Sequence, residues 1–239
     1  LAEHLERLQA SAHAMMFANV PDNDFITEAI YATLKANGMS DGAHIRLTLT
    51  RGEKITSGMD PRLNQSGCTL IVLAEWKAPV YQNAITLITS SIRRNGPANI
   101  DSKIHHNNLI NNILAKIEAN NAGADDALML DNNGFVAETN ACNIFMIKNG
   151  MVFTPNADAC LPGITRKTVI TLCQQNNIPI HLKNISLTEM YNADQVFTTG
   201  TMGELTAVKM IDGRAIINRS GTDLLQHIND LFRNLTLAL

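Results

Sequence analysis

The spacing of hydrophobic residues predicts two helices followed by strands in the first part of the chain. Apolar residues recur at helical intervals over 1–16 and again over 24–37, where Asp24 can cap the amino end of the second helix. From Ala43 the period changes to two, so that apolar residues alternate with Arg46 and with threonines. Two further apolar runs predict buried strands over 68–76 and 84–90.

Helical and strand patterns alternate irregularly in the second part of the chain, beyond a segment rich in Pro, Gly and Asn at 93–102. The predicted helices span 109–122, 163–176 and 222–235, and the predicted strands span 127–131, 135–138, 143–148, 151–154 and 195–198. Because strict strand–helix–strand alternation is rare, we predict an α+β fold. Its predicted parts are a small N-terminal α/β domain over 1–92, a linker over 93–102 and a C-terminal domain over 103–239.

Composition and charge narrow the class of protein without identifying a function. Of the 239 residues, 45% are hydrophobic and 17% are charged, which is ordinary for a globular chain that buries a core. The net charge is −3 and no block of like charges is present, which argues against a nucleic-acid partner. No apolar run reaches the ~20 residues that span a bilayer, so we predict no membrane partner.

The four cysteines are scattered along the sequence and show no metal-type spacing. We therefore predict free thiols, a cytoplasmic location and no metal site. The chain has no initiator Met, and its hydrophobic pattern opens within a helix. We expect from this that an N-terminal segment is missing from the sequence.

Two turns rich in Gly and Thr are candidate anion sites. Gly163, Ile164 and Thr165 open a predicted helix, and Gly200 and Thr201 follow a predicted strand. Backbone N–H groups at the start of a helix are unpaired and lie at its positive end, and threonine hydroxyls add donors. Turns of this composition are also common without any ligand, so an anion site is indicated only if other binding residues accompany them.

Three charged residues accompany these turns. Lys103 lies between the predicted linker and a helix, Glu138 ends a predicted strand, and Arg7 lies on the N-terminal helix. An arginine beside the two turns would complete a phosphate site. A lysine taken alone is most often a solvated surface charge, so Lys103 becomes a candidate only in combination with the other features.

Six short segments in this order make the chain resemble the class IV aminotransferases. They are EHLERL (3–8), AHIR (43–46), SK (102–103) with HNNL soon after, AETNACNIF (137–145), LPGITR (161–166) and TTGTMGELTAV (198–208). That family includes branched-chain and D-amino-acid aminotransferases and 4-amino-4-deoxychorismate lyase. The resemblance implies a two-domain fold of type IV, with a small N-terminal α/β domain that is truncated at its start here and a larger C-terminal pseudo-barrel domain.

The resemblance also implies pyridoxal 5′-phosphate (PLP) as the cofactor. Lys103 would hold PLP as a Schiff base and later move a proton between the substrate Cα atom and the cofactor. Glu138 would pair with the pyridine nitrogen and keep it protonated, so that the ring withdraws electrons. The implied cofactor-binding residues are Arg7, Lys103, Glu138, Asn143, Gly163, Ile164, Thr165, Gly200 and Thr201, and the implied substrate-binding residues are Arg46, Thr201 and Met202.

The implied activity is transfer of an amino group between an amino acid and a 2-oxo acid. The turn at 200–206 favours branched-chain substrates by resemblance. D-Amino-acid transamination is an alternative, because Arg51 or Arg62 could bind a substrate carboxylate, and so is the lyase reaction, which eliminates pyruvate. The alternative from a different class is a catalytically silent protein of this fold that acts as a binding or scaffold module. Family members are dimers with active sites near the subunit interface, so we expect a homodimer.

One position near the lysine departs from the branched-chain pattern. Those enzymes carry Tyr five residues after the lysine, where it bonds the phenolic oxygen of the cofactor, and this chain has Asn108. His105 and His106 precede it and are interpreted as structural or solvated, with a proton-shuttle role as the alternative. The departure leaves substrate identity and stereochemistry open.

Overall fold

The computed structural model describes residues 1–78 and 80–237. Pro79, Ala238 and Leu239 lie outside the described residues, and the last two of these end the predicted C-terminal domain. The chain divides into two compact units, Leu1–Pro79 and Val80–Leu239.

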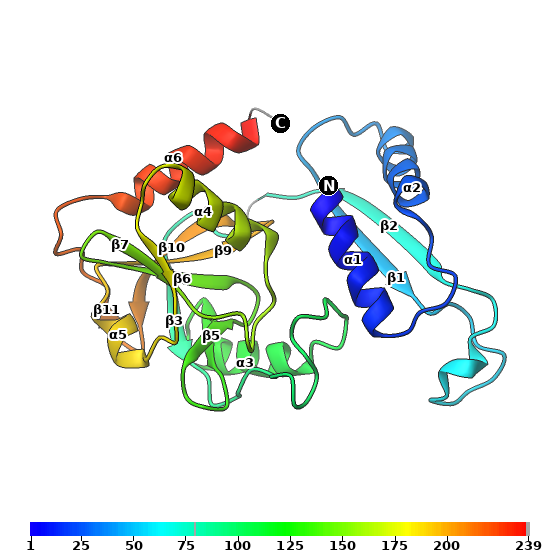
Figure 1. Cartoon of the computed structure of the whole chain (residues 1–239), viewed down its shortest axis with the longest axis horizontal. Coiled ribbons are helices and arrows are strands. Elements are labelled where there is room, and N and C mark those ends of the chain that lie inside the picture. Colours follow the sequence, from blue (N-terminus) through cyan, green and yellow to red (C-terminus); the bar gives the residue numbers. More distant parts are fainter. Residues whose placement is uncertain (79, 238–239) are drawn as a thin grey trace. The chain divides into compact units, whose positions relative to one another are not determined.

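The first unit packs two helices against one face of a two-stranded antiparallel sheet (Figure 1). Its elements are α1 (Ala2–Ala14), α2 (Asn23–Ala36), β1 (Ala43–Thr50), a short 3₁₀ helix η1 (Pro61–Leu63) and β2 (Thr69–Trp76). Leu5 and Ile26 from the helices are buried against Leu47 and Val72 from the strands. Because side chains alternate across a strand, the period of two places these apolar residues on the covered face.

Helix α2 begins one residue before the predicted start. The side chain of Asp22, rather than that of Asp24, caps it by accepting a hydrogen bond from the Phe25 N–H at 2.8 Å. Both aspartates suit a helix start, and the sequence alone does not distinguish them.

A mixed sheet of nine strands forms the centre of the second unit (Figure 1). Its strand order is β5-β4-β3-β10-β9-β6-β7-β8, and β11 pairs with β10. The strands are β3 (Ile85–Thr89), β4 (Asp126–Leu130), β5 (Val136–Thr139), β6 (Asn143–Lys148), β7 (Met151–Thr154), β8 (Ile180–Leu182), β9 (Gln195–Gly200), β10 (Glu204–Ile211) and β11 (Arg214–Ala215). The helices are α3 (Ile110–Asn121), α4 (Ile164–Gln175), α5 (Leu187–Tyr191) and α6 (Leu224–Leu237).

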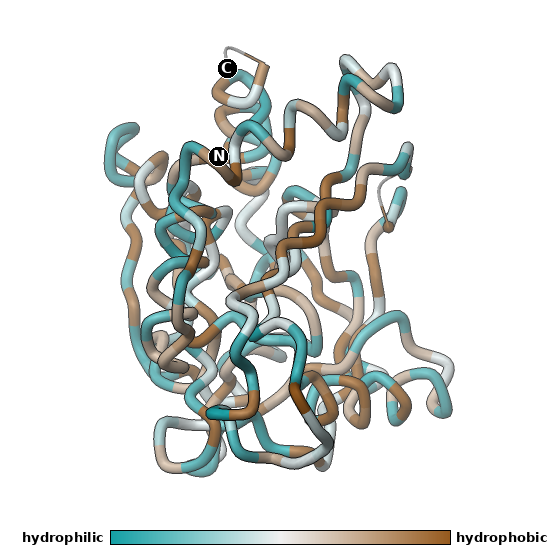
Figure 2. Tube along the Cα trace, turned by 90° about the vertical axis from the view of Figure 1, so that its right-hand side faces the viewer, coloured by the Kyte–Doolittle hydropathy of each residue, from teal (hydrophilic) through white to brown (hydrophobic). Residues whose placement is uncertain are grey.

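The central strands of this sheet are buried on both faces. In β6, Phe145 and Ile147 pack with α4 and α6, while Ile144 and Met146 pack with residues of β3, β10 and α5. Phe145 also stacks on Phe197 of β9, with ring centroids 4.9 Å apart. A strand covered on both faces reads as a continuous apolar run. Figure 2 shows hydrophobic runs, in brown, along extended segments of the chain.

The structure divides the chain earlier than the predicted boundary at residue 92. Strand β3, which the sequence placed in the first domain, pairs in parallel with both β4 and β10. The segment 93–102, predicted as a linker, packs on the second unit, and Arg94 and Ser102 within it are buried. Parallel pairing of distant strands leaves no local turn signal, which is why the sequence pattern did not indicate it.

Four elements of the second unit have no counterpart among the predicted ones. Strands β8 and β11 and helix α5 are short, and β10 begins within the turn that was predicted at 200–206. Strand β10 is antiparallel to β9, with Leu205 opposite Thr199 and Glu204 opposite Gly200. The turn between them therefore covers 201–203 only.

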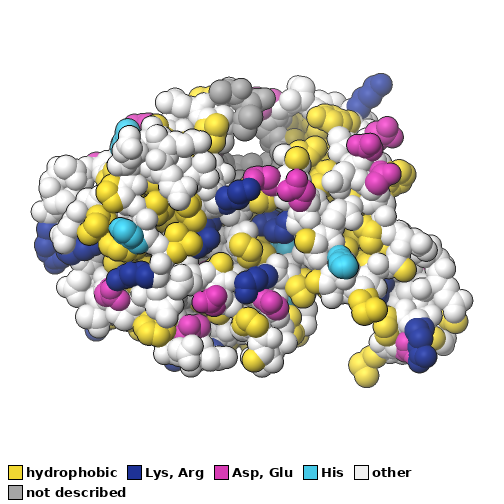
Figure 3. Space-filling view, viewed as in Figure 1, with side chains coloured by type: hydrophobic (Ala, Val, Ile, Leu, Met, Phe, Trp, Pro, Cys, Tyr) yellow, Lys and Arg dark blue, Asp and Glu magenta, His cyan; other side chains and the backbone are white. Residues whose placement is uncertain are grey.

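No helix within 1–78 and 80–237 has the length and apolar character needed to cross a membrane. On the face shown in Figure 3, basic and acidic side chains are interspersed. This distribution is consistent with a net charge of −3 and with the absence of a block of like charges in the sequence.

Candidate active site

Glu138 is a buried carboxylate at the end of β5 and the most distinctive polar group of the second unit. It is 5% exposed. The Arg94 Nε–H donates to its Oε1 atom at 2.6 Å, and the Asn143 Nδ2–H donates to its Oε2 atom at 3.1 Å. Burial raises the pKa of Glu138 to about 7, although the charge of Arg94 opposes this shift. The carboxylate is thus held by one cation and one amide, away from water.

Arg94 is the charged partner of Glu138, and the sequence pattern did not indicate it. Its side chain is 6% exposed, its backbone N–H donates to the Leu130 carbonyl oxygen at 2.8 Å, and its Nη1–H donates to Asn111 Oδ1 at 3.3 Å. Its neighbour Arg93 instead donates to a backbone carbonyl oxygen, that of Ser90, at 3.2 Å. No local signal separates these two consecutive arginines, because the partner Glu138 lies far along the chain.

Asn143, at the start of β6, links Glu138 to the segment that leads into α4. Besides Glu138, its Nδ2 group donates to the Leu161 carbonyl oxygen at 2.8 Å. Its Oδ1 atom lies beside Gly163, where a Cβ atom would come within 2.1 Å of it. The predicted cofactor-binding residues Glu138, Asn143 and Gly163 are therefore neighbours in the structure.

The start of α4 has the properties of an anion site. Gly163 is its N-cap residue and provides no side-chain hydrogen bond to the first turn, which contains Ile164 and Thr165. Among the described residues, the buried Arg166 Nε and Thr199 Oγ1 atoms have no hydrogen-bond partner. Thr199 lies opposite Asn143 in the register of β9 and β6. Unused backbone donors together with buried donors that lack a partner fit a bound anionic group such as a phosphate.

The second predicted anion turn follows β9. Gly200 ends the strand, and a Cβ atom on it would lie 3.0 Å from the Cys142 Sγ atom, so this turn also contacts the segment after Glu138. Thr201 is exposed and Met202 is half-buried. The buried hydroxyl nearest to this turn therefore belongs to Thr199, which is 2% exposed, rather than to Thr201.

Lys103 lies within electrostatic reach of this region and is open to solvent. Its side chain is 45% exposed, and its Nζ atom lies 3.9 Å from Asp101 Oδ1. Burial raises the pKa of the Cys160 thiol to about 12, an effect that Glu138 reinforces and that Arg166, Arg94 and Lys103 oppose. The lysine amine is thus accessible to a ligand.

The residues that follow Lys103 differ in their surroundings. His105 and Asn108 are exposed. The Nδ1 atom of His106 is buried and has no hydrogen-bond partner among the described residues, and burial together with the charge of Arg94 lowers the pKa of this imidazole. His106 is therefore half-buried rather than solvated, and the charge of Arg94 acts on its imidazole.

The first unit contains the remaining candidates. Arg7 is half-buried on α1, and its guanidinium has no hydrogen bond or ion pair with the described residues. Arg46 is exposed on β1, opposite Leu73 of β2. Arg51 donates to the carbonyl oxygens of Met15 and Met16, and Arg62 pairs with Asp60. Arg51 and Arg62, the alternative carboxylate binders, are thus both engaged within the chain.

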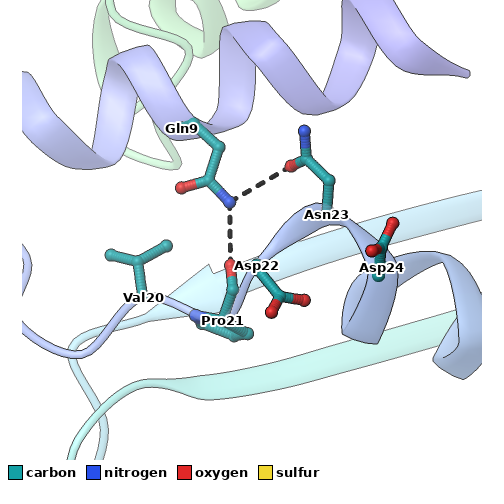
Figure 4. Close-up of a pocket in the computed structure, with 6 residues that line it drawn as sticks. All are labelled: Gln9, Val20, Pro21, Asp22, Asn23 and Asp24. Carbon is teal, nitrogen blue, oxygen red and sulfur yellow. Dashed lines mark hydrogen bonds between the residues drawn. The ribbon is translucent and has the colours of Figure 1, made fainter.

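The first unit has a hollow of about 520 Å³, which is lined by Gln9 of α1 and by residues 20–24 (Figure 4). Gln9 crosses it and donates to the Pro21 carbonyl oxygen at 2.8 Å and to Asn23 Oδ1 at 3.3 Å. These bonds tie α1 to the start of α2. In the described part of the chain, no three His, Cys, Asp or Glu side chains gather in a way that could hold a metal ion.

Comparison with known proteins places these residues in a family. A sequence model for the amino-transferase class IV family matches residues 1–211. Branched-chain-amino-acid aminotransferase-like protein 2 of Arabidopsis thaliana is 58% identical over 238 residues, which are 99% of this chain and 43% of that protein. A putative branched-chain-amino-acid aminotransferase of Methanocaldococcus jannaschii is 34% identical, over 98% of this chain and 81% of that protein.

A solved structure supports the same relationship. A T.th. branched-chain amino acid aminotransferase with pyridoxamine 5′-phosphate superposes with a TM-score of 0.88 at 30% identity, covering 98% of this chain and 77% of that one. The predicted fold of type IV is thereby confirmed. The chain spans less than half of the length of the Arabidopsis relative. Since the family match covers residues 1–211 and includes both the buried Glu138 and the start of α4, this chain belongs to the class IV aminotransferases.

Proposed function

We propose that the chain is a PLP-dependent aminotransferase that moves an amino group between a branched-chain-type amino acid and a 2-oxo acid. Family membership and the names of the relatives support this activity. The T.th. structure, which contains pyridoxamine 5′-phosphate, supports the cofactor. The observation that carries the proposal is the buried Glu138 carboxylate, which Asn143 joins to the uncapped start of α4.

PLP, when bound, supplies a protonated ring that withdraws electrons from the substrate Cα atom. Glu138 would hold the proton on the ring nitrogen, and it suits this role because its carboxylate is buried and already pairs with a cation. The charge of Arg94 favours the ionised carboxylate, but burial outweighs it and raises the pKa of Glu138 to about 7. A cationic ring nitrogen beside the carboxylate would favour the ionised form further.

The phosphate is assigned to the two turns and to an arginine. Backbone N–H groups of Ile164 and Thr165 lie at the positive end of α4, and the Thr199 hydroxyl lacks a partner among the described residues. Gly200 and Thr201 border the same region at the second turn. Arg7, from the first unit, is the proposed arginine by resemblance to the family, and its guanidinium is half-buried.

Lys103 is the proposed covalent attachment point and proton carrier. Its amine would hold PLP through the cofactor aldehyde, with loss of water, and would carry the proton that leaves the substrate Cα atom. The accessible amine of Lys103 supports this assignment. Arg46, Thr201 and Met202 are the proposed substrate contacts, by resemblance to branched-chain enzymes.

Self-association is proposed through α3. Charged side chains of this helix are bonded within the chain, since Lys116 pairs with Asp126 and Glu118 accepts a hydrogen bond from Ser90. Its outer face is apolar, and that face includes Leu109, Ile110, Ile113, Leu114 and Ile117, all of which are at least 39% exposed. An apolar surface depleted of charge is typical of the core of an interface, which supports a homodimer. The four free thiols support a reducing compartment, the cytoplasm.

Reduction with borohydride after incubation with PLP tests the central claim. The full chain should retain the cofactor on the peptide that contains Lys103, as detected by mass spectrometry, whereas Lys103→Ala should retain none. A wild-type chain that binds no PLP would exclude every enzymatic alternative and favour a silent binding or scaffold protein.

Amino donors then distinguish the reactions. Glutamate formed from 2-oxoglutarate with L-leucine supports the proposed activity, and glutamate formed only with D-alanine supports the D-amino-acid alternative. Pyruvate released from aminodeoxychorismate, without transamination, supports the lyase. Glu138→Gln should keep PLP bound and lower the turnover by about a hundredfold or more, since general acid–base and electrostatic groups contribute effects of this size.

A further inference from the structure

We propose that Asn143 is a positioning residue, which holds the Glu138 carboxylate at a fixed distance from the start of α4. This inference rests on the proposed function, because the carboxylate and the helix start are assigned to the ring and the phosphate of one cofactor. Asn143 acts through the Glu138 carboxylate and through the segment 161–163, and not on the reacting atoms.

The amide nitrogen of Asn143 is bonded on both sides. Nδ2 donates to Glu138 Oε2 at 3.1 Å and to the Leu161 carbonyl oxygen at 2.8 Å. The Leu161 N–H donates in turn to Glu138 Oε1, at 3.4 Å. One amide and one peptide unit thus bind the carboxylate in addition to Arg94. Asn143 is 6% exposed, so loss of its donors would leave these acceptors unpaired away from water, which is costly.

Gly163 is required by its contact with Asn143 and not by its backbone conformation. Its φ of −66° is accessible to any residue. A Cβ atom at this position, however, would lie 2.1 Å from Asn143 Oδ1, which is far inside van der Waals contact. The Asn143 side chain therefore occupies the space that a Cβ atom would fill. The amide that holds Glu138 also sets the position of the N-cap residue of α4.

Cys142, which precedes Asn143 in the sequence, lies similarly close to Gly200 at the turn after β9, but less tightly. A Cβ atom on Gly200 would lie 3.0 Å from Cys142 Sγ. A thiol can turn away by rotation about χ1, whereas the Asn143 amide is fixed by two hydrogen bonds and by Gly163. The coupling between carboxylate and anion site is therefore assigned to Asn143.

The advantage of such coupling follows from the covalent structure of PLP. The ring nitrogen and the phosphate are joined by a short, stiff framework, so a site binds both only if its own carboxylate and donors are at the matching separation. A site that already has this separation binds without a cost for reorganisation. Disturbing Asn143 should therefore weaken PLP binding even though the phosphate donors and Glu138 are unchanged.

A double-mutant cycle tests the coupling. PLP affinity is measured by equilibrium titration of the full chain for wild type, Gly163→Ala, Asn143→Ala and the double variant. Each single change should weaken PLP binding at least about tenfold, and the double variant should bind no more weakly than Asn143→Ala, because the added Cβ then fills the vacated space. Gly96→Ala is the matched control, since a Cβ there meets no atom within 4 Å, and it should bind as wild type does. Losses that multiply in the double variant would overturn the proposal.

Asn143→Asp separates positioning from simple filling of space. This change keeps the shape of the side chain, removes both donors and adds a second carboxylate beside Glu138. It should weaken PLP binding at least as much as Asn143→Ala does, and near-normal binding would show that only the volume of Asn143 matters.

Failure of the proposed function gives a different result. If the wild-type chain binds no PLP, the same cycle is measured in the free energy of unfolding of the cofactor-free chain. Non-additive effects of Gly163→Ala and Asn143→Ala would then support the coupling by itself, and additive effects would exclude it.

Discussion

Arg94 and Glu138 form a buried ion pair in which the Nε atom lies 2.6 Å from the Oε1 atom and less than a tenth of either side chain is exposed. The pair connects the segment before Lys103 to the end of β5. Because a buried charge is stable only beside an opposite one, each residue makes the burial of the other possible. The position of the proposed ring partner thus depends on an arginine that does not belong to any of the recognised motifs.

Removal of the arginine should destabilise the chain. Arg94→Met keeps much of the side-chain volume and leaves Glu138 buried without its partner, so the free energy of unfolding should fall by about 3–5 kcal/mol. Urea denaturation monitored by circular dichroism measures the change. The control is Arg94→Met combined with Glu138→Gln, which should lose less than the sum of the two single variants. Wild-type stability for Arg94→Met would mean that the pair does not form in solution.

Glu138 should make the stability of the cofactor-free chain depend on pH. Burial raises its pKa from 4.5 to about 7, so the unfolded chain releases this proton at a lower pH than the folded chain does. The contribution of Glu138 to the free energy of unfolding is therefore fully present below about pH 4.5 and is lost as the pH rises through about 7. The size of this effect is on the order of 3 kcal/mol. The measurement is the difference in unfolding free energy between wild type and Glu138→Gln across this range. A difference that does not vary with pH would contradict the shift.

Thr199→Val should raise the stability of the cofactor-free chain and lower its affinity for PLP. The Thr199 hydroxyl is buried without a partner among the described residues, so its replacement by a methyl group should stabilise the cofactor-free chain by about 1 kcal/mol. If the hydroxyl serves the phosphate, the same change should weaken PLP binding about tenfold. Thermal unfolding with and without PLP measures both effects. Thr201→Val, at an exposed position, is the comparison, and an equal loss of affinity there would argue against a special role of Thr199.

Arg7→Ala should weaken the binding of PLP more than it lowers the turnover at saturating PLP. A lost charge-assisted hydrogen bond to a phosphate corresponds to about a tenfold to hundredfold loss of affinity. The measurement compares PLP with pyridoxal, which has no phosphate, and only the affinity for PLP should change. Arg7→Lys should recover part of the loss because it restores the charge. Equal losses for both compounds would place Arg7 away from the phosphate.

Short contiguous motifs explain which features the sequence determined. The apolar period identified both helices and both strands of the first unit, because each element is encoded by its own residues. AETNACNIF and LPGITR each place their polar residues within one turn or one strand end, so Glu138, Asn143 and Gly163–Thr165 could be selected together. The match of the family model over residues 1–211 confirmed the family that these motifs indicated.

Only the tertiary structure decided how these groups are held. Arg94 reaches Glu138 because β3 pairs in parallel with β4, an arrangement that brings residues far apart in the chain together and leaves no local pattern. The division between the units ahead of β3 and the contact of Asn143 with Gly163 likewise depend on residues that are not neighbours in the sequence. The sequence by itself indicated candidates for the chemistry, since that choice depends on side-chain type and local spacing. The fold decided which of them meet, since burial and long-range pairing set every distance between them.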